Sequence, residues 1–113
     1  MNTGLVYITG VPGTGKTTSC EELVRRGHKA FDTDAEGMKS WYEEKSGERS
    51  VDQPGWDEAS EEFKASNNLK NHRSKIEELS KLSKNGLVFL CGSTWNDEEI
   101  MDLFDLVIIL AVP

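Results

Sequence analysis

The stretch "GVPGTGKTT", residues 10–18, decides the fold that the sequence predicts. It matches Gly-x-x-x-x-Gly-Lys-[Ser/Thr], a pattern in which glycines, having no Cβ, let backbone amides approach and surround a phosphate group. In this pattern Lys16 places an ammonium group on the outer phosphates, and the Thr17 hydroxyl ligates Mg²⁺. The predicted nucleotide-binding residues are Gly10, Val11, Pro12, Gly13, Thr14, Gly15, Lys16, Thr17 and Thr18.

The residues on both sides of this loop supply the context that the motif needs, a buried strand before it and a helix after it. Residues 5–8 form a short apolar run typical of a strand that is covered on both faces. Cys20, Leu23 and Val24 recur at helical spacing, and Gly27 suits the end of that helix. The helix N-terminus adds a partial positive charge to the anion site. This context disfavours the alternative, a glycine-rich turn that binds nothing.

Composition and charge narrow the classes of protein that fit. With 113 residues, of which 36% are hydrophobic and 29% charged, the chain suits one soluble globular domain. Its net charge of -7 disfavours a nucleic-acid polymer or an anionic membrane as a partner, because the field repels phosphates. The longest apolar run, residues 106–112, is too short to span a bilayer, and we expect no export segment. Cys20 and Cys91 suit buried free thiols, so the expected location is cytoplasmic.

Four β-prone runs alternate with helical patterns along the chain. This alternation predicts an α/β fold in which helices cover both faces of a parallel sheet. The runs are residues 5–9, 28–32, 87–91 and 106–110.

The connection between the second and third runs is much longer than the dozen or so residues that a crossover needs. We therefore expect an insertion over residues 35–85, and its apolar spacing predicts helices. One would carry Met38, Trp41 and Tyr42, a second Ala59 and Phe63, and a third, longer one Leu69, Ile76, Leu79 and Leu82. Trp41, Tyr42 and Trp56 could stack on a planar ligand, although aromatic residues at this spacing more often belong to a core.

A second polar stretch, "FDTDAE" at residues 31–36, follows the second predicted strand. Asp32 and Asp34 fall at the carboxyl edge of the sheet, where open α/β folds bind ligands. One carboxylate could hold Mg²⁺ through water while the other accepts a proton from an attacking hydroxyl. In the alternative interpretation, Asp34 caps a helix that begins near Ala35 and Asp32 is a solvated strand end.

These stretches together resemble the small-molecule and nucleoside-monophosphate kinase branch of the P-loop fold, in particular the shikimate-kinase and adenylate-kinase-like group. The resemblance is carried by "GVPGTGKTT", "FDTDAE", "VFLCGS" (residues 88–93) and "LFDLVIIL" (residues 103–110). It implies a three-layer P-loop NTPase fold with strand order 2-3-1-4-5, and an insertion after the second strand that binds the phosphoryl acceptor. It also implies that residues 13 and 15–18 bind ATP and Mg²⁺. Lys16, Asp32 and Asp34 would then be catalytic, and Thr17 and Asp32 would be the metal-binding residues.

The chain departs from this group after its fourth strand. It stops at "LAVP", residues 110–113, whereas these kinases continue through an arginine-bearing lid, a fifth strand and an adenine-contacting loop. We therefore expect the N-terminal portion of a longer kinase, with the sheet order 2-3-1-4 and without lid and fifth strand. Residues 106–110 would then form an apolar edge that favours self-association. Strictly monomeric sedimentation across a concentration series would contradict this expectation.

Other classes of P-loop protein fit the sequence less well. Residues 34–37 match the Asp-x-x-Gly of GTPases, but they follow the loop too closely, and an Asn-Lys-x-Asp motif is missing. Motor-type ATPases need an acidic residue at the end of a strand beside the loop, and residues 87–92 and 107–113 contain none. The sequence therefore favours an ATP-dependent kinase that acts on a small metabolite or nucleotide. The alternative left open is an ATP-binding module that is non-catalytic or only hydrolytic.

Overall fold

A parallel four-stranded sheet forms the centre of the protein in the computed structural model, which describes residues 2–10, 16–35, 37–94 and 96–111. Its strand order is β2-β5-β1-β6, and each neighbouring pair is parallel. The strands are β1 (Gly4–Gly10), β2 (Lys29–Asp32), β5 (Leu87–Cys91) and β6 (Leu106–Leu110). The α/β class and the 2-3-1-4 order of the four predicted strands are confirmed.

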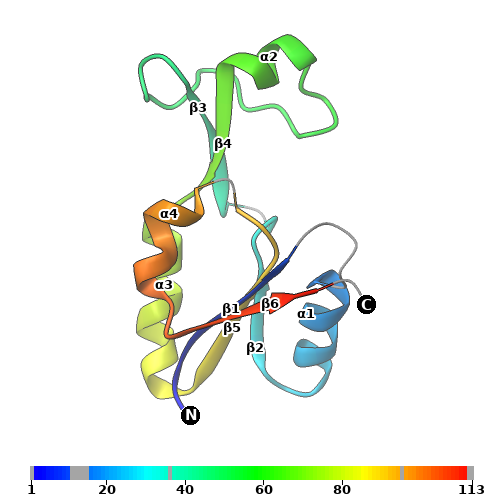
Figure 1. Cartoon of the computed structure of the whole chain (residues 1–113), viewed down its shortest axis with the longest axis vertical. Helices are drawn as coiled ribbons and strands as arrows, with labels where there is room; N and C mark the ends of the chain where they lie inside the picture. Colours follow the sequence, from blue (N-terminus) through cyan, green and yellow to red (C-terminus); the bar gives the residue numbers. More distant parts are fainter. Residues whose placement is uncertain (1, 11–15, 36, 95, 112–113) are drawn as a thin grey trace.

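Helices cover both faces of this sheet and make three layers (Figure 1). Helix α1 (Lys16–Arg25) packs on one face, where Val6, Ile8 and Cys20 belong to one buried cluster. Helix α3 (Arg73–Leu82) covers the opposite face, followed by the short helix η1 (Ser83–Asn85). Because side chains alternate along a strand, β1 contributes Val6 and Ile8 to the first face and Leu5 and Tyr7 to the second. An unbroken apolar run is therefore what this strand requires.

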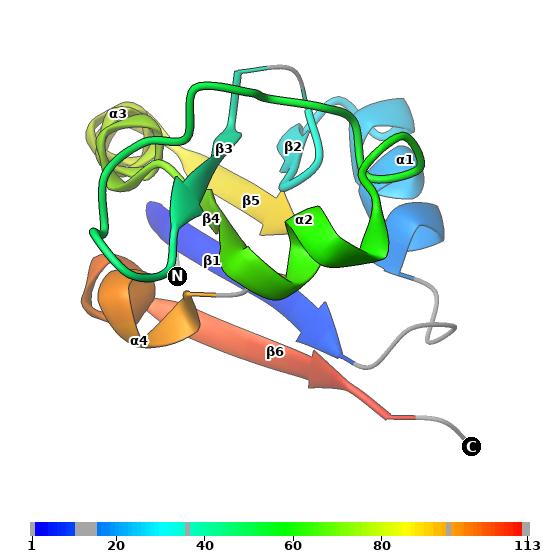
Figure 2. The same ribbon diagram turned by 90° about the horizontal axis from the view of Figure 1, so that it is seen from above.

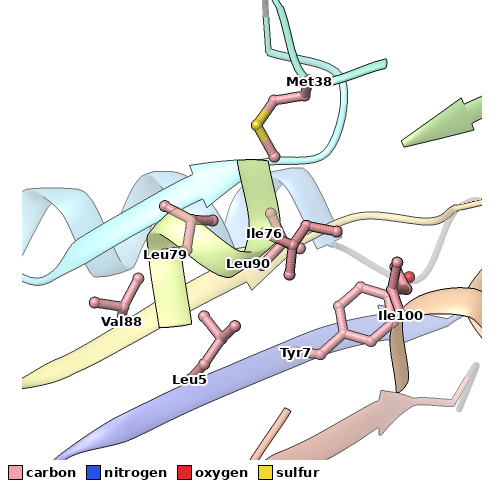
Figure 3. Packing of buried hydrophobic residues seen from close by; sticks show 8 residues of the cluster. All are labelled: Leu5, Tyr7, Met38, Ile76, Leu79, Val88, Leu90 and Ile100. Carbon is pink, nitrogen blue, oxygen red and sulfur yellow. The ribbon is translucent and has the colours of Figure 1, made fainter. Parts of the chain in front are cut away.

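The larger core lies between the sheet and α3 (Figure 3). Ile76 and Leu79 of α3 contact the side chains of β1 and β5, and Ile100 closes the cluster at the end of helix α4 (Asp97–Ile100), which continues into η2 (Met101–Leu103). The Tyr7 ring stacks on Phe104 with centroids 4.5 Å apart and planes 13° apart. The ring of Tyr7 therefore belongs to the core, and its hydroxyl lies at the border of the core, where it can bond to a polar side chain.

Residues 35–85 form a β-hairpin that carries one short helix and is followed by α3, so the helix expected to carry Met38, Trp41 and Tyr42 is wrong. Strands β3 (Lys39–Glu43) and β4 (Asn67–Asn71) pair antiparallel, and α2 is confined to Glu61–Ser66. Trp41 faces Leu69 across the hairpin, and both pack with Ala59 and Phe63 in a small core of their own. Trp41 and Tyr42 are neighbours in a strand and therefore lie on opposite faces, Trp41 in this small core and Tyr42 against His72. Their helical spacing with Met38 concealed the strand. The longer predicted helix begins at Arg73, beyond Leu69.

The hairpin extends away from the sheet and carries α2 at its far end (Figure 1). Viewed from above, the hairpin and α2 lie across the sheet between α3 and α1 (Figure 2). Its base is closed by a hydrogen bond from His72 N to Met38 O at 2.8 Å. Asn71 Nδ2 donates to Thr33 O, just after β2, at 3.0 Å and so holds this base to the sheet layer. The insertion thus starts and ends at the carboxyl side of the sheet.

Strand β6 is the outer strand on its side of the described sheet. Leu106, Ile108 and Ile109 are 45%, 39% and 72% exposed, which is high for side chains of this type. Self-association through residues 106–110 stays a prediction. Within the described residues, none of the helices has both the length and the apolar character to cross a membrane.

Gly92, directly after β5, is predicted to tolerate no side chain. Its φ is +135°, and an added Cβ would lie 2.2 Å from Oγ1 of the buried Thr33. We expect Gly92→Ala to lower the free energy of unfolding by about 1–3 kcal/mol from backbone strain, and more from the clash. Chemical denaturation measures this, with Gly86→Ala as the control, since a Cβ there meets nothing within 4 Å. Equal stability of the two variants would contradict the prediction.

Candidate functional site

The carboxyl ends of three parallel strands meet at one edge of the sheet. Gly10 ends β1, Asp32 ends β2 and Cys91 ends β5, and Asp32 is the register partner of Cys91. The segments that follow these strands are joined by hydrogen bonds, from Thr33 N to Cys91 O and from Gly92 N to Ile8 O, both 2.9 Å long. This edge is where open α/β folds bind their ligands.

The predicted phosphate-binding loop begins at this edge. Residues 11–15 lie outside the described residues, as do the side chains of Lys16 and Thr17. The structure does place both ends of the loop, because β1 ends at Gly10 and α1 begins at Lys16. Thr18 is exposed on the first turn of α1. The strand before the loop and the helix after it are therefore both present, as the motif requires.

Asp32 and Asp34 lie at the same edge but have different surroundings. Asp32 is half-buried, and its Oδ1 accepts a hydrogen bond from Asp34 N at 2.8 Å. Asp34 is exposed and forms an ion pair with Lys39. Residues 33–35 form a turn, so the alternative in which Asp34 caps a helix at Ala35 is wrong. The roles of Asp32 and Asp34 in metal and acceptor binding stay predictions.

Two buried free thiols lie behind this edge. Cys20 of α1 and Cys91 of β5 both belong to the buried cluster beneath α1. Burial raises the pKa of the Cys91 thiol to about 12, and the neighbouring Cys20 and Asp32 add to the rise. Burial also raises the pKa of Cys20. Both side chains therefore remain protonated at neutral pH and pack as small apolar groups.

A cavity of about 710 Å³ opens between the insertion and the start of α4. One wall consists of α2, β4 and the side chains of Trp41 and Trp56, and the other of Thr94 and residues 96–99. Neither Asp32 nor Asp34 is among the described residues that line it. The sequence analysis did not predict this cavity, although the polar run that follows β5 could have indicated it.

The segment between β5 and α4 connects the cavity with the phosphate-binding loop. Ser93 Oγ donates to Gly10 O, the last carbonyl of β1, at 3.2 Å. The next residue, Thr94, lines the cavity and donates a hydrogen bond to Asp97 Oδ1. Ser93 and Thr94 therefore link the end of β1 with the cavity wall.

Asp97 is the carboxylate that this segment holds in place. Its Oδ1 also accepts a hydrogen bond from Tyr7 OH at 3.1 Å. Burial raises the pKa of Tyr7, and the negative charge of Asp97 adds to the rise, so the phenol stays a donor. Within the described residues, Asp97 Oδ2 has no hydrogen-bond partner. Sequence reasoning missed Asp97, because the residue that anchors it lies ninety positions earlier in the chain.

The two tryptophans of the cavity wall, Trp41 and Trp56, stack on each other. Trp41 is buried, donates from Nε1 to Pro54 O at 2.8 Å and stacks on Trp56 with centroids 5.9 Å apart. Lys64 lies over the Trp56 ring at 4.2 Å from its centroid. Trp41 is therefore a core residue of the insertion, and Trp56 supports the cavity wall.

Comparison with known proteins identifies the family. A family model described as an AAA domain matches residues 6–113, so the chain belongs to this family, which is of the P-loop NTPase type. The match supports a nucleotide-binding P-loop domain. None of the curated proteins and none of the solved structures compared with the chain matches it.

The raised thiol pKa values predict slow thiol chemistry. At pH 8 both thiols should remain protonated and shielded, so Ellman's reagent should modify the native protein roughly 100-fold or more slowly than the chain in denaturant. Absorbance at 412 nm follows the reaction, and Cys20→Ala and Cys91→Ala variants assign it to each thiol. Modification of either thiol at the denatured rate would contradict the burial described above.

Proposed function

We propose that this chain is an ATP-dependent kinase domain that transfers the γ-phosphoryl group to a small metabolite or nucleotide. The observation that carries the proposal is the cavity between the insertion and α4. Its lining residue Thr94 directly follows Ser93, which donates to Gly10 O at the start of the phosphate-binding loop. A domain that only hydrolyses ATP needs water at its loop, whereas a kinase needs a second site for an acceptor.

The size and lining of the cavity fit a small molecule. About 710 Å³ falls within the range of ligand pockets in proteins, and its walls combine aromatic surface with amides, hydroxyls and charges. One wall belongs to the insertion and the other to the sheet layer. The acceptor would therefore be held between two structural units, which is consistent with the acceptor role expected for residues 35–85.

The residues at the loop suit ATP and Mg²⁺ in their chemistry. The N-terminus of α1 and the half-buried carboxylate of Asp32 lie at the carboxyl edge of the sheet. To these the motif adds a lysine and a hydroxyl, which suit a phosphate and Mg²⁺. Bound Mg·ATP supplies the phosphoryl group and neutralises charge on it. Lys16 would stabilise the charge that develops on the moving group, while Thr17 and Asp32 would hold the metal.

The resemblance to kinases implies that Asp34 orients the phosphoryl acceptor. To orient an acceptor it would first have to release Lys39, with which it pairs. The two reduced thiols and the net charge of -7 are consistent with a cytoplasmic domain that binds neither a nucleic-acid polymer nor a membrane.

A titration with Mg·ATP tests the nucleotide site. In ¹H–¹⁵N NMR spectra, Mg·ATP should shift the amides of residues 13–18 and of Asp32 saturably. Lys16→Ala should weaken the apparent affinity about tenfold or more, because a charge-assisted contact is lost. Lys45→Ala removes an exposed lysine of the hairpin turn and should leave the affinity unchanged. An intact fold whose amides do not respond to millimolar Mg·ATP would contradict the proposal.

A second measurement separates a kinase from the alternative module. Acceptor-dependent formation of ADP from a panel of metabolites supports phosphoryl transfer. ATP binding with the same slow ADP formation in every reaction would favour the non-catalytic or hydrolytic module.

A further inference from the structure

Resting on the proposed function, we infer that the cavity takes an alcohol without a phosphate group, and that Asp97 accepts the proton of its reacting hydroxyl. The inference names the acceptor class, which the motifs leave open between a hydroxyl and a phosphate. It depends on how Asp97 is anchored and on the charges around it.

The two oxygens of Asp97 are in unequal positions. Tyr7 and Thr94 both donate to Oδ1, which fixes the carboxylate on the cavity wall. The other oxygen, Oδ2, accepts nothing from the described residues. A carboxylate that is fixed by one oxygen and has the other unpaired can accept a hydrogen bond from a neutral hydroxyl. It would repel a phosphate group, which carries a charge of about −1.5 to −2 at pH 7.

The charges of the cavity wall also disfavour an anionic acceptor. Acidic residues outnumber lysines among the described lining residues: Glu61, Asp97, Glu98 and Glu99 against Lys64 and Lys70. Lys70 Nζ lies 3.0 Å from Glu99 Oε1, and this contact lowers the pKa of Glu99. Lys64 lies over Trp56 and 3.8 Å from Glu61. Both lysines are thus already partnered, and a phosphate would meet excess negative charge.

Arg73, which contacts the lining residue Glu99, is also engaged. Arg73, at the start of α3, makes a bidentate pair with Asp102 at 2.8 and 2.7 Å and donates to the carbonyl of Glu99. Bidentate arginine pairs are the usual means of phosphate recognition in proteins. In this structure Arg73 instead holds α3 against η2.

Asp97 also needs no rearrangement to reach an acceptor, in contrast to Asp34, which is paired with Lys39 outside the cavity wall. In the proposed step the hydroxyl proton of the alcohol passes to Asp97 Oδ2 as its oxygen bonds to the γ-phosphorus of ATP. The bond from that phosphorus to the β,γ-bridging oxygen breaks, and its electron pair leaves with ADP. Asp97 then releases the proton to water.

Matched pairs of compounds test the acceptor class by binding alone, without ATP. The probes are adenosine with AMP, glucose with glucose 6-phosphate, and serine with phosphoserine. In NMR spectra of the protein, at least one alcohol should shift the amides of residues 67–70 and 97–100, and its phosphorylated partner should bind about tenfold more weakly or worse. A phosphorylated member that binds as tightly as its alcohol, or a panel without any binding alcohol, would overturn the inference.

The variant Asp97→Asn tests the role of the carboxylate. Its amide oxygen can still accept from Tyr7 and Thr94, so the unfolding midpoint should stay unchanged, while transfer to the alcohol that binds should fall by about 10²–10⁴-fold. Asp52→Asn makes the same chemical change on an exposed loop away from the cavity and should have wild-type rates. Transfer by Asp97→Asn at the wild-type rate would overturn the role of Asp97.

The two proposals fail in different ways. Transfer of phosphate from ATP only to phosphorylated acceptors would overturn the alcohol inference and leave the kinase standing. Binding of ATP without transfer to any compound would overturn the kinase and the proton transfer at Asp97 with it, while the paired binding data would still decide which charge class the cavity accepts.

Discussion

Parallel pairing of β1 with β5 on one side and β6 on the other is the constraint on which the rest of the structure depends. It places β1 at the interior of the sheet, where both of its faces are covered and every second side chain enters a different core. It also fixes where β1 ends, and so where the phosphate-binding loop begins. Because β2 and β5 run in the same direction, their following segments converge on the same edge, and that edge carries the candidate site.

The insertion depends on this edge through a pair of buried amides. Asn71 N donates to Asn96 Oδ1 at 3.1 Å, and Asn96 Nδ2 donates back to Asn71 O at 3.0 Å, which ties the end of β4 to the start of α4. The amide side chain of Asn71 reaches Thr33 after β2. These contacts set the position of the hairpin relative to α4, and the cavity lies between the two. Asn71 and Asn96 thus fix the two walls of the cavity relative to each other.

Local patterns were sufficient to predict the sheet, because β1, β5 and β6 each contain an apolar run and β2 is a short β-prone segment that follows the helix-ending Gly27. The bounds of β5 and β6 agree with the predicted runs, and β1 and β2 differ by a residue or two. The hairpin was missed because Trp41 gains its burial from Leu69 and Phe63, which are distant in sequence. Asn96 occupies the N-cap position of α4, but its side-chain amide bonds to the distant Asn71 and makes no cap hydrogen bond to the helix. The same holds for the candidate site. The loop motif is a local pattern and was predicted, whereas Asp97 is positioned by the distant Tyr7 and was not predicted.

Tyr7 belongs to the core and to the candidate site at once. Its ring is fully buried and stacked on Phe104, and its hydroxyl holds the carboxylate that faces the cavity. A thermal fluctuation that loosens the packing around this ring therefore releases Asp97 as well, so order in the core and order in the cavity wall form one cooperative unit. A change that disorders the core around Tyr7 therefore also disorders the cavity wall at Asp97. The side chain at position 7 must both fill the core and donate a hydrogen bond to Asp97, which few residue types can do.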